Sequence, residues 1–380
     1  MNKNNLTYVF GSGRTRKIKE KNYKAKEFFY SLFYFSEKNT NIELIEMESE
    51  NFNPSGIKVF LKVIDKILRK LTNLPFYFCE ILNKKNLNIL LNSNKVIITN
   101  DRLAISLLPF LIYIKFFKNI DIYIIIMGLF SKKKGNAVVT FLQKLFIRIL
   151  IKLSKNLIFL GKGEYKNSIN KVKKNLAKKF VFLPFSVDYD FWSKNVKVEK
   201  NNSQILFIGN DGNRDYEFLI NLAKNMNNFN FVFITKNIKN INLPDNVKLL
   251  NGSWNNYELD DEEIRLYYQS SLLVINPLLE TYQPSGQSVS LQSMAAGTGL
   301  LITKTKGFWD SDSFKDEESI FFLEKNEIDL WKKKIIYLSE NREKLNSVTK
   351  NAKSKVQKEY SMDLFNTKLE NIIFDKKNKL

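Results

Sequence analysis

Short apolar runs alternate along the first half of the chain with segments in which apolar residues recur every three to four positions. The runs predict buried strands, and the segments predict helices that cover a sheet. The predicted strands of this half are residues 6–10, 41–47, 94–99, 122–127, 157–160 and 180–183. The predicted helices between them are residues 25–35, 58–71, 105–117 and 138–153. This alternation is typical of a doubly wound parallel sheet, so we expect an α/β fold.

A polar stretch rich in Lys and Asn then precedes a second series of the same kind. Its predicted strands are residues 205–209, 229–235, 247–250, 272–275 and 300–303. Its predicted helices are residues 216–225, 261–270, 328–340, 343–360 and 362–374. We therefore expect two Rossmann-like domains. The expected division is a first domain at 1–192, a linker at 193–203, a second domain at 204–360 and a terminal helix within 361–380.

The most informative segment is residues 272–303, LLVINPLLETYQPSGQSVSLQSMAAGTGLLIT, with the pattern of strand, polar loop, short helix, tight turn and strand. Ser285, Gly286 and Ser288 mark the start of the helix, and Gln287 lies in the same turn. The free amides of this turn and the helix dipole favour an anion, and Gly286 lets a diphosphate approach the backbone. The alternative is an ordinary α/β crossover with a well-capped helix.

Two further side chains are placed near this predicted anion site by their spacing. Gln292 follows Ser288 by four residues, so it shares the same helix face and leans toward the predicted phosphate, where it can reach a ribose hydroxyl. Lys304 directly follows a predicted strand and so begins at the edge of the sheet where ligands bind. A solvated lysine is the alternative for Lys304.

A second candidate loop, GNDGNRDY at residues 209–216, follows the first strand of the second domain. Gly209 suits a tight turn, and Arg214 would lie near the first turn of the next helix, where its planar fork can hold a diphosphate. The alternative is a surface arginine paired with Asp211 or Asp215.

The chain has 60 basic and 39 acidic residues, giving a formal net charge of +21. A basic surface attracts nucleic acid and anionic membranes, but only eight of the basic residues are Arg, which indicates bias toward Lys as much as selection for charge. There is no His, and Cys79 is the one cysteine. This excludes His-dependent nucleophiles and an intrachain disulfide, and it argues against a metal site with nitrogen or sulfur ligands.

The chain opens on a strand pattern without the apolar core of a signal peptide, and no run reaches the roughly 18 apolar residues that span a bilayer. We expect a cytoplasmic protein. The predicted helix 138–153 and its flank place Lys144, Arg148, Lys152 and Lys155 in one basic stripe. Such a helix is able to lie on an anionic membrane, at the inner face of the cell membrane, although a core helix with one solvent-facing stripe has the same pattern.

The segments GNDGNRD at 209–215 and SGQSVSLQSMAAG at 285–297, with the order of the elements, resemble the nucleotide-sugar motifs of retaining GT-B glycosyltransferases, chiefly family 4. The segment FLPFSVDYDFW at 182–192 resembles the interdomain segment of that family. The resemblance implies two Rossmann-like domains that face a cleft, and a terminal helix that crosses back to the first domain.

The chain departs from the family pattern at several positions. Gln292 stands where a ribose-binding Glu is usual, which keeps hydrogen-bonding capacity and removes the charge. Pro284 stands where an earlier Glu is expected, and the nearest acid is Glu280. Asp215 lies near the place of a Lys, and Gly128 lies where many relatives have a His.

The resemblance implies a transferase that uses a nucleotide-diphosphate sugar as donor substrate, with no cofactor and no metal. The acceptor implied is a glycan or a lipid-linked sugar of polysaccharide or lipopolysaccharide synthesis, glycosylated with retention. Arg214 and the amides of residues 285–288 would stabilise the leaving diphosphate, and Glu280 would contact the donor sugar as a catalytic residue. The loop with Gly11 and Gly13 resembles one that approaches the donor phosphates or the acceptor.

Three other functions stay open from the sequence. A catalytically silent partner of another transferase would account for the missing His and for Gln292. A sugar-nucleotide epimerase has the same architecture but needs acid and base groups on both sides of the sugar. The lack of His makes such a pair of groups less expected, and in the transferase it leaves backbone carbonyls and Asp101 or Glu164 for catalysis. A nucleic-acid-binding protein would need Arg and aromatic residues interleaved on one face, which the sequence lacks, so we expect no nucleic-acid partner.

Overall fold

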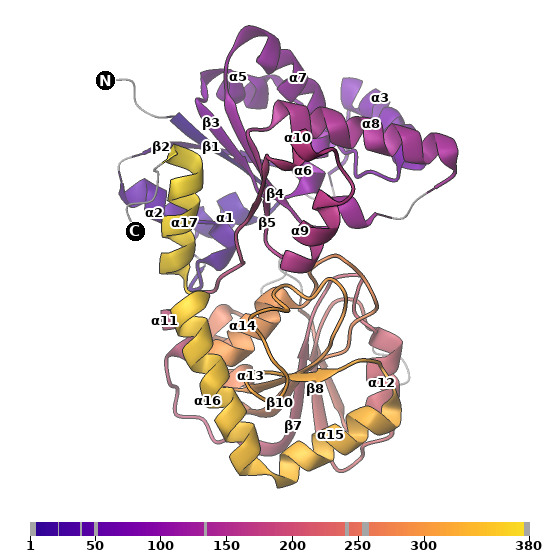
Figure 1. Ribbon diagram of the computed structural model, residues 1–380, viewed down its shortest axis with the longest axis vertical. Coiled ribbons are helices and arrows are strands. Elements are labelled where there is room, and N and C mark those ends of the chain that lie inside the picture. Colours follow the sequence, from indigo (N-terminus) through magenta and orange to yellow (C-terminus); the bar gives the residue numbers. More distant parts are fainter. Residues whose placement is uncertain are drawn as a thin grey trace.

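The computed structural model describes residues 5–375 apart from residues 22, 39, 49–51, 133–134, 240–242 and 253–257. The described chain forms two α/β domains, each built on a six-stranded parallel sheet (Figure 1). Residues 1–4 and 376–380 of the expected first and last segments lie outside the described part. The two sheets confirm the α/β architecture that the alternating apolar pattern predicts.

The first sheet has the strand order β2-β1-β3-β4-β5-β6, with every neighbouring pair parallel. Its strands are β1 (Asn5–Phe10), β2 (Asn41–Glu46), β3 (Lys95–Ile98), β4 (Asp121–Ile126), β5 (Asn156–Phe159) and β6 (Phe180–Phe182). Its helices are α1 (Arg14–Lys19), η1 (Glu27–Phe29), α2 (Leu32–Glu37), α3 (Ile57–Thr72), α4 (Phe78–Ile81), α5 (Lys84–Asn92), α6 (Asp101–Ser106), α7 (Leu108–Phe117), η2 (Leu129–Ser131), α8 (Ala137–Leu153), α9 (Lys162–Ile169) and α10 (Lys174–Ala177). Central strands covered by helices on both faces read as continuous apolar runs.

The helix expected at residues 25–35 is interrupted. It consists of η1 and α2, because Tyr30 and Ser31 have φ angles of 48° and 66°, in the left-handed region that no helix continues through. The buried Tyr8 hydroxyl donates to the Tyr30 carbonyl over 2.7 Å and holds this turn. The interruption is therefore fixed by a contact with β1 that local sequence does not reveal.

The helix expected at residues 105–117 is also divided, into α6 and α7, which meet at Leu107. Pro109 has no amide proton, so it cannot donate to the carbonyl one turn earlier. The division is a local effect of the proline.

The second sheet has the strand order β12-β11-β10-β7-β8-β9 and is also parallel. Its strands are β7 (Asn201–Ile208), β8 (Asn230–Ile234), β9 (Val247–Leu250), β10 (Ser271–Asn276), β11 (Gly299–Thr303) and β12 (Phe321–Leu323). Its helices are α11 (Tyr189–Ser193) in the connection between domains, α12 (Tyr216–Lys224), α13 (Asp261–Ser270), α14 (Gln287–Ala296), α15 (Ile328–Glu340) and α16 (Arg342–Glu359). The strand order reverses between β7 and β10, and the loops after such a pair of strands leave room for a ligand.

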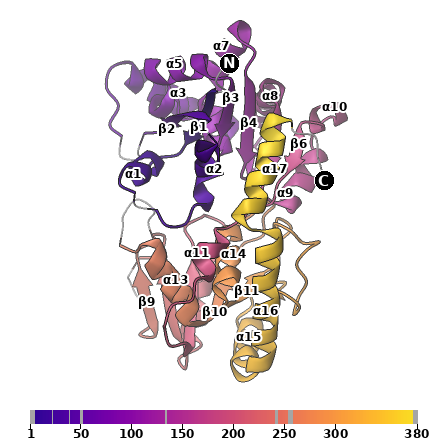
Figure 2. The same cartoon turned by 90° about the vertical axis from the view of Figure 1, so that its left-hand side faces the viewer.

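The last helix, α17 (Met362–Phe374), leaves the second domain and lies against the first (Figures 1 and 2). The Tyr123 hydroxyl of β4 donates to the Ile373 carbonyl over 2.9 Å. The Phe374 ring packs edge-on against Phe35, with ring centroids 5.8 Å apart. These contacts confirm the terminal helix that crosses back to the first domain.

One apolar cluster continues from the first domain into the second. It includes Tyr8 and Phe29 of the first domain, Trp192 of the connection, and Trp309 and Tyr360 of the second domain, all almost completely buried. Because large aromatic side chains bury the most area per residue, this cluster stabilises the observed arrangement of the two domains.

Candidate anion-binding site between the domains

The loops that follow β7 and β10 are joined by backbone hydrogen bonds at the carboxyl edge of the second sheet. The Asp215 amide donates to the Pro277 carbonyl over 3.1 Å, and the Leu279 amide donates to the Asn213 carbonyl over 2.9 Å. The two sequence motifs therefore form one structural unit, although about 70 residues separate them.

The Arg214 side chain lies inside this unit and is only 4% exposed. It passes between Gly209 and Gly286, where an added Cβ atom would come within 2.6 or 2.7 Å of the guanidinium nitrogens. The guanidinium donates to the side-chain oxygen of Asn276, and its Nε lies 3.2 Å from the Asp211 carboxylate. Pairing with Asp211 was one alternative for this arginine, but the side chain is buried rather than on the surface.

The start of α14 leaves several donors without acceptors. Gly286 is its N-cap residue, with a φ angle of 75°, and no side chain caps the helix. The Nδ2 atom of the fully buried Asn276 has no hydrogen-bond partner among the described residues. Unpaired buried donors cost free energy, and a bound anion would accept from Asn276 and the first-turn amides beside the Arg214 charge. The arrangement is therefore suited to bind a phosphate group.

Other residues predicted for this loop contact both domains. The Ser285 hydroxyl donates to the Asp211 carboxylate over 2.7 Å. The side-chain Nε2 of Gln287 donates to the Leu160 carbonyl of the first domain over 2.7 Å, while Ser288 in the same turn is half-buried. The first turn of α14 thus faces the first domain directly.

Glu280 and Lys304 lie at the rim of this unit. Glu280 is exposed and accepts a hydrogen bond from the Lys306 amide over 2.9 Å. The Lys304 ammonium is paired with Glu324 over 3.2 Å, and its side chain is 47% exposed. Within the described structure neither side chain forms a hydrogen bond with Arg214, so their roles toward a ligand stay predictions.

Gln292 belongs to a buried hydrogen-bond network that joins the domains. Its Nε2 donates to Oε1 of Glu27 over 2.8 Å, and its Oε1 accepts from the Tyr268 hydroxyl over 3.0 Å. The Trp192 indole also donates to Glu27, over 2.8 Å. Burial raises the pKa of Glu27 to about 7, against the lowering effect of these hydrogen bonds. Both polar atoms of the Gln292 side chain therefore have partners within the protein, and its contact with a ribose hydroxyl stays a prediction.

Gly11 and Gly13 lie in the loop after β1. Gly13 is the N-cap residue of α1 and has a φ angle of 95°, which glycine adopts without strain. The next residue, Arg14, is half-buried, and desolvation lowers the pKa of its guanidinium group. The Thr15 amide donates to Glu46 on β2 over 3.2 Å, so the turn is held against the edge of the first sheet.

Two buried carboxyls hold the loop after β4. Both oxygens of Glu164 accept from the Gly128 amide, over 2.9 and 3.1 Å, and Asp101 accepts from the Met127 amide over 2.9 Å. Burial raises the pKa of both groups, that of Glu164 to about 8 with a contribution from the Asp101 charge. A Cβ at position 128 would lie 2.6 Å from the side-chain oxygen of Gln283 in the second domain. The two carboxyls therefore position a loop that touches the second domain.

The domains approach closely at two further glycines. A Cβ at Gly161 would lie 2.6 Å from the Pro284 ring, and one at Gly163 would lie 2.5 Å from the Lys306 carbonyl oxygen. Real Cβ atoms do not approach other atoms so closely, so only glycine fits at these positions without displacing the neighbouring chain.

Comparison with known proteins finds likeness in structure only. No protein-family model and no curated protein matches the sequence. A glycosyltransferase from Rickettsia africae ESF-5 superposes with a TM-score of 0.64 at 14% identity, covering 99% of this chain and 100% of that chain. Sucrose-phosphate synthase from Thermosynechococcus elongatus gives a TM-score of 0.67 at 9% identity, covering 98% of each chain. Anabaena HepE in complex with UDP-glucose gives 0.65 at 9% identity, covering 98% of this chain and 99% of that chain.

The chain has the GT-B glycosyltransferase fold. In this GT-B protein, the hydrogen bond from the Gln287 side chain of α14 to the Leu160 carbonyl, directly after β5, places the Arg214 unit opposite the carboxyl edge of the first sheet. Among the described residues no three His, Cys, Asp or Glu side chains are grouped to hold a metal ion.

Two residues of the GT-B site were not predicted from the sequence. Glu27 is the single acid in the aromatic segment KEFFYSLF at 26–33, and an isolated acid in such a segment is a signal for a buried, hydrogen-bonded carboxyl. Asn276 ends the apolar strand β10 before a proline, and a buried amide at a strand end is a signal for a ligand or a partner loop.

Changing Gln292 to Glu, the residue usual in family 4, is expected to destabilise this GT-B chain near neutral pH. The new carboxyl would face Glu27 at hydrogen-bond distance, and two such groups cannot both ionise without repulsion. Urea unfolding at pH 8 is expected to show a loss of about 1–3 kcal/mol, with a smaller loss at pH 5. The control is the exchanged pair Glu27→Gln with Gln292→Glu, which restores one acid and one amide. Failure of that pair to recover stability would contradict a direct contact.

Proposed function

We propose that the protein transfers a sugar from a nucleotide-diphosphate sugar to a glycan or lipid-linked acceptor, in the synthesis of a cell-surface polysaccharide or lipopolysaccharide. The observation that carries the proposal is the buried Arg214 at the uncapped start of α14, with the unpaired Asn276 amide beside it. Support also comes from the fold, which HepE shares in its complex with UDP-glucose. UDP-glucose is therefore the first donor to test.

The proposed role of Arg214 and α14 follows from the negative charge that develops on the leaving diphosphate. When the bond between the sugar C1 atom and the phosphate oxygen breaks, the leaving diphosphate gains negative charge. Arg214 and the first-turn amides of α14 are fixed before the reaction, so they would stabilise this charge most strongly in the transition state. Because these donors supply the stabilisation that a divalent cation supplies elsewhere, we propose transfer without a metal. Retention of configuration is proposed from the resemblance to family 4.

A catalytically silent partner protein is the second candidate function. It is favoured by the engagement of Gln292 with Glu27 and of Glu280 with the Lys306 amide, since both side chains were expected to contact the donor. In that case the site would bind a nucleotide and leave its sugar intact.

Calorimetric titration with UDP, GDP and their glucose and mannose conjugates, in the presence of EDTA, tests the proposal. We expect saturable binding of one nucleotide and slow release of free sugar from its conjugate, followed by chromatography. Binding with no sugar release, also after addition of glycan and lipid-linked acceptors, would favour the silent partner. The absence of binding to every nucleotide would overturn the donor site.

A further inference from the structure

Helices α3 and α8 pack side by side on the outer side of the first domain (Figure 1). Both leave large apolar side chains in solvent, with Ile57 77%, Phe60 65% and Phe141 66% exposed. The complete set, named here the α3–α8 face, is Ile57, Val59, Phe60, Val63, Ile67, Leu71, Val138, Phe141 and Leu145. Soluble proteins rarely expose apolar side chains in such a group unless the surface binds something.

The charges on the same two helices are arranged for an anionic partner. Their exposed charged side chains are all basic: Lys62, Lys66, Lys70, Lys144, Arg148 and Lys152. The one acid in these helices, Asp65, is buried and accepts from the Phe78 and Cys79 amides over 2.7 and 3.1 Å. An apolar stripe flanked by lysines is the pattern of a helix that lies in the headgroup layer of an anionic membrane. Two copies of so basic a face would repel each other.

A cavity of about 340 Å³ opens beside α8, between this helix, η2 and the turn after α9. Its lining combines apolar side chains, among them Phe130, Ile147 and Leu176, with five cations, namely Lys132, Lys144, Arg148, Lys171 and Lys173. Lys144 and Arg148 are shared with the basic flank of the α3–α8 face, so the cavity adjoins that face.

One lining residue of this cavity is a buried polar group without a partner. Gln143 is 7% exposed, and its Nε2 atom has no hydrogen-bond partner among the described residues. An unpaired amide donor in an apolar cavity with a cationic mouth fits an apolar chain that ends in a phosphate.

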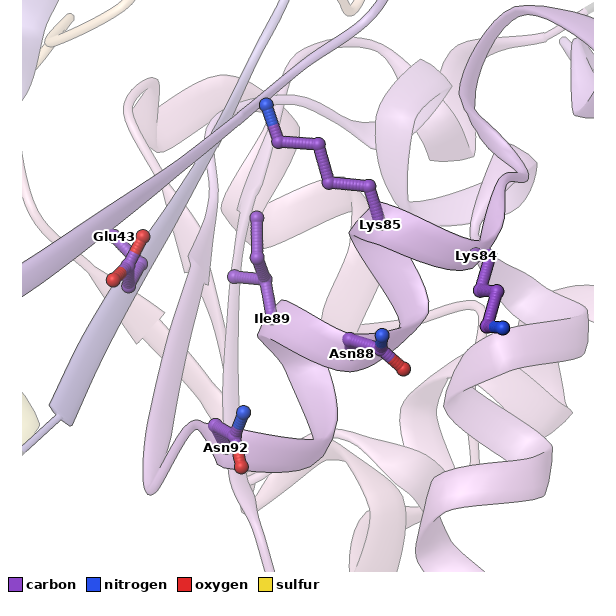
Figure 3. Close-up of a pocket in the computed structure, with 6 residues that line it drawn as sticks. All are labelled: Glu43, Lys84, Lys85, Asn88, Ile89 and Asn92. Atoms are coloured by element: carbon purple, nitrogen blue, oxygen red, sulfur yellow. The ribbon is translucent and has the colours of Figure 1, made fainter.

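A second cavity among the described residues of this domain has a different character. It has a volume of about 450 Å³ and lies between β2 and α5, where Glu43 stands across from the α5 side chains (Figure 3). Ile89 is the one apolar residue among its six lining residues. An acid opposite Lys84 and Lys85 balances part of their charge, so this cavity does not suit an anionic amphiphile.

We propose that the α3–α8 face docks on an anionic bilayer and that the cavity beside α8 binds one anionic phospholipid of that bilayer. No described helix is long and apolar enough to cross a membrane, so the docking is peripheral. Phe130 in the cavity is two residues from Gly128, which touches the second domain. Docking therefore brings the membrane surface close to the contact between the domains. The proposal stands independently of the transferase activity.

Sedimentation with vesicles tests the docking. The full chain is expected to sediment with vesicles of phosphatidylcholine and phosphatidylglycerol, and to stay in solution with phosphatidylcholine alone. The pair Phe60→Ser with Phe141→Ser is expected to weaken binding roughly tenfold or more, since both rings are exposed and their loss leaves the core intact. The control pair is Ile336→Ser with Tyr337→Ser, which removes two exposed apolar side chains from α15 in the second domain. Equal binding by both pairs, or binding to phosphatidylcholine alone, would overturn the proposal.

A fluorescence measurement tests insertion of the face. The variant Phe141→Trp is expected to lose intensity with vesicles that contain brominated phosphatidylglycerol, whereas Ile336→Trp keeps its intensity. The native Trp192, Trp309 and Trp331 are almost completely buried and so contribute a constant signal. The fourth tryptophan, Trp254, lies outside the described residues and is replaced by Phe in both variants. Equal quenching of the two variants would contradict insertion at α8.

Calorimetry tests the cavity. Short-chain phosphatidylglycerol, below the concentration at which it forms micelles, is expected to bind saturably to the wild-type protein. Ile147→Trp, which fills the cavity, is expected to abolish this binding, while Ile336→Trp leaves it unchanged. The absence of saturable binding, or equal competition by inorganic phosphate, would overturn the lipid site.

Discussion

Replacing Arg214 with alanine is expected to weaken nucleotide-diphosphate binding about 10- to 150-fold, the largest loss from any single change in the site. The estimate corresponds to a charge-assisted hydrogen bond of about 1.5–3 kcal/mol. Arg214 is buried and prepositioned between Gly209 and Gly286, so its charge is weakly screened and little ordering remains for the bound state. Calorimetry with the nucleotide that binds the wild-type protein measures the effect.

Two variants distinguish the role of Arg214 in binding from its role in the fold. Arg214→Lys keeps the charge and loses the planar fork, so it is expected to bind with intermediate affinity. Arg342→Ala removes an arginine at the start of α16 and is expected to leave affinity unchanged. Urea unfolding of each variant shows whether the chain is still folded. Wild-type affinity in a folded Arg214→Ala protein would place the phosphate elsewhere.

The free energy of unfolding is expected to decrease as pH rises from about 4.5 to 8. Burial raises the pKa of Glu164 to about 8 and that of Glu27 to about 7, from an ordinary value of 4.5. In this range the unfolded chain has lost protons that the folded chain still binds, so raising the pH favours unfolding. Each group contributes about 1.4 kcal/mol per pH unit between its two pKa values, and for Glu164 the whole change is on the order of 5 kcal/mol.

Urea unfolding at several pH values measures this dependence. Glu164→Gln resembles the protonated acid and keeps an acceptor for the Gly128 amide, so it is expected to flatten the curve up to about pH 8. Glu27→Gln is expected to flatten it up to about pH 7. Glu318→Gln, at an exposed acid of the second domain, serves as the control. Stability that rises with pH over this range would show that both carboxyls are ionised in the folded chain.

The architecture follows from the sequence because the information that specifies it is local. Strands buried on both faces appear as apolar runs, and the helices between them show their own period. The short helices α1, α4, α9, α10 and α11 were not predicted, since they have eight residues or fewer and too few for a periodic signal. The nine-residue α5 was not predicted either. The turn at Tyr30 and Ser31 escaped prediction because its stabilising partner, Tyr8, belongs to another strand.

The site was predictable only in part, for the same reason. Arg214 and Gly286 come from loops after neighbouring strands, so the topology alone brings the two motifs together. The partners of Gln287 and Gln292 are Leu160 and Glu27, which belong to the other domain. The spacing of residues in the second domain does not specify which residues of the first domain contact them.

The glycines at the domain contact determine the distance between the two halves of the site. Because Gly161 and Gly163 carry no side chain, the atoms that limit approach are the Pro284 ring and the Lys306 carbonyl themselves. One added methyl at either position would act as a spacer and widen the gap by about the length of a carbon–carbon bond. The absence of a Cβ atom at these two glycines therefore determines how closely the two domains approach each other. Substitution of these glycines by residues of increasing size would increase the distance between the two domains in steps.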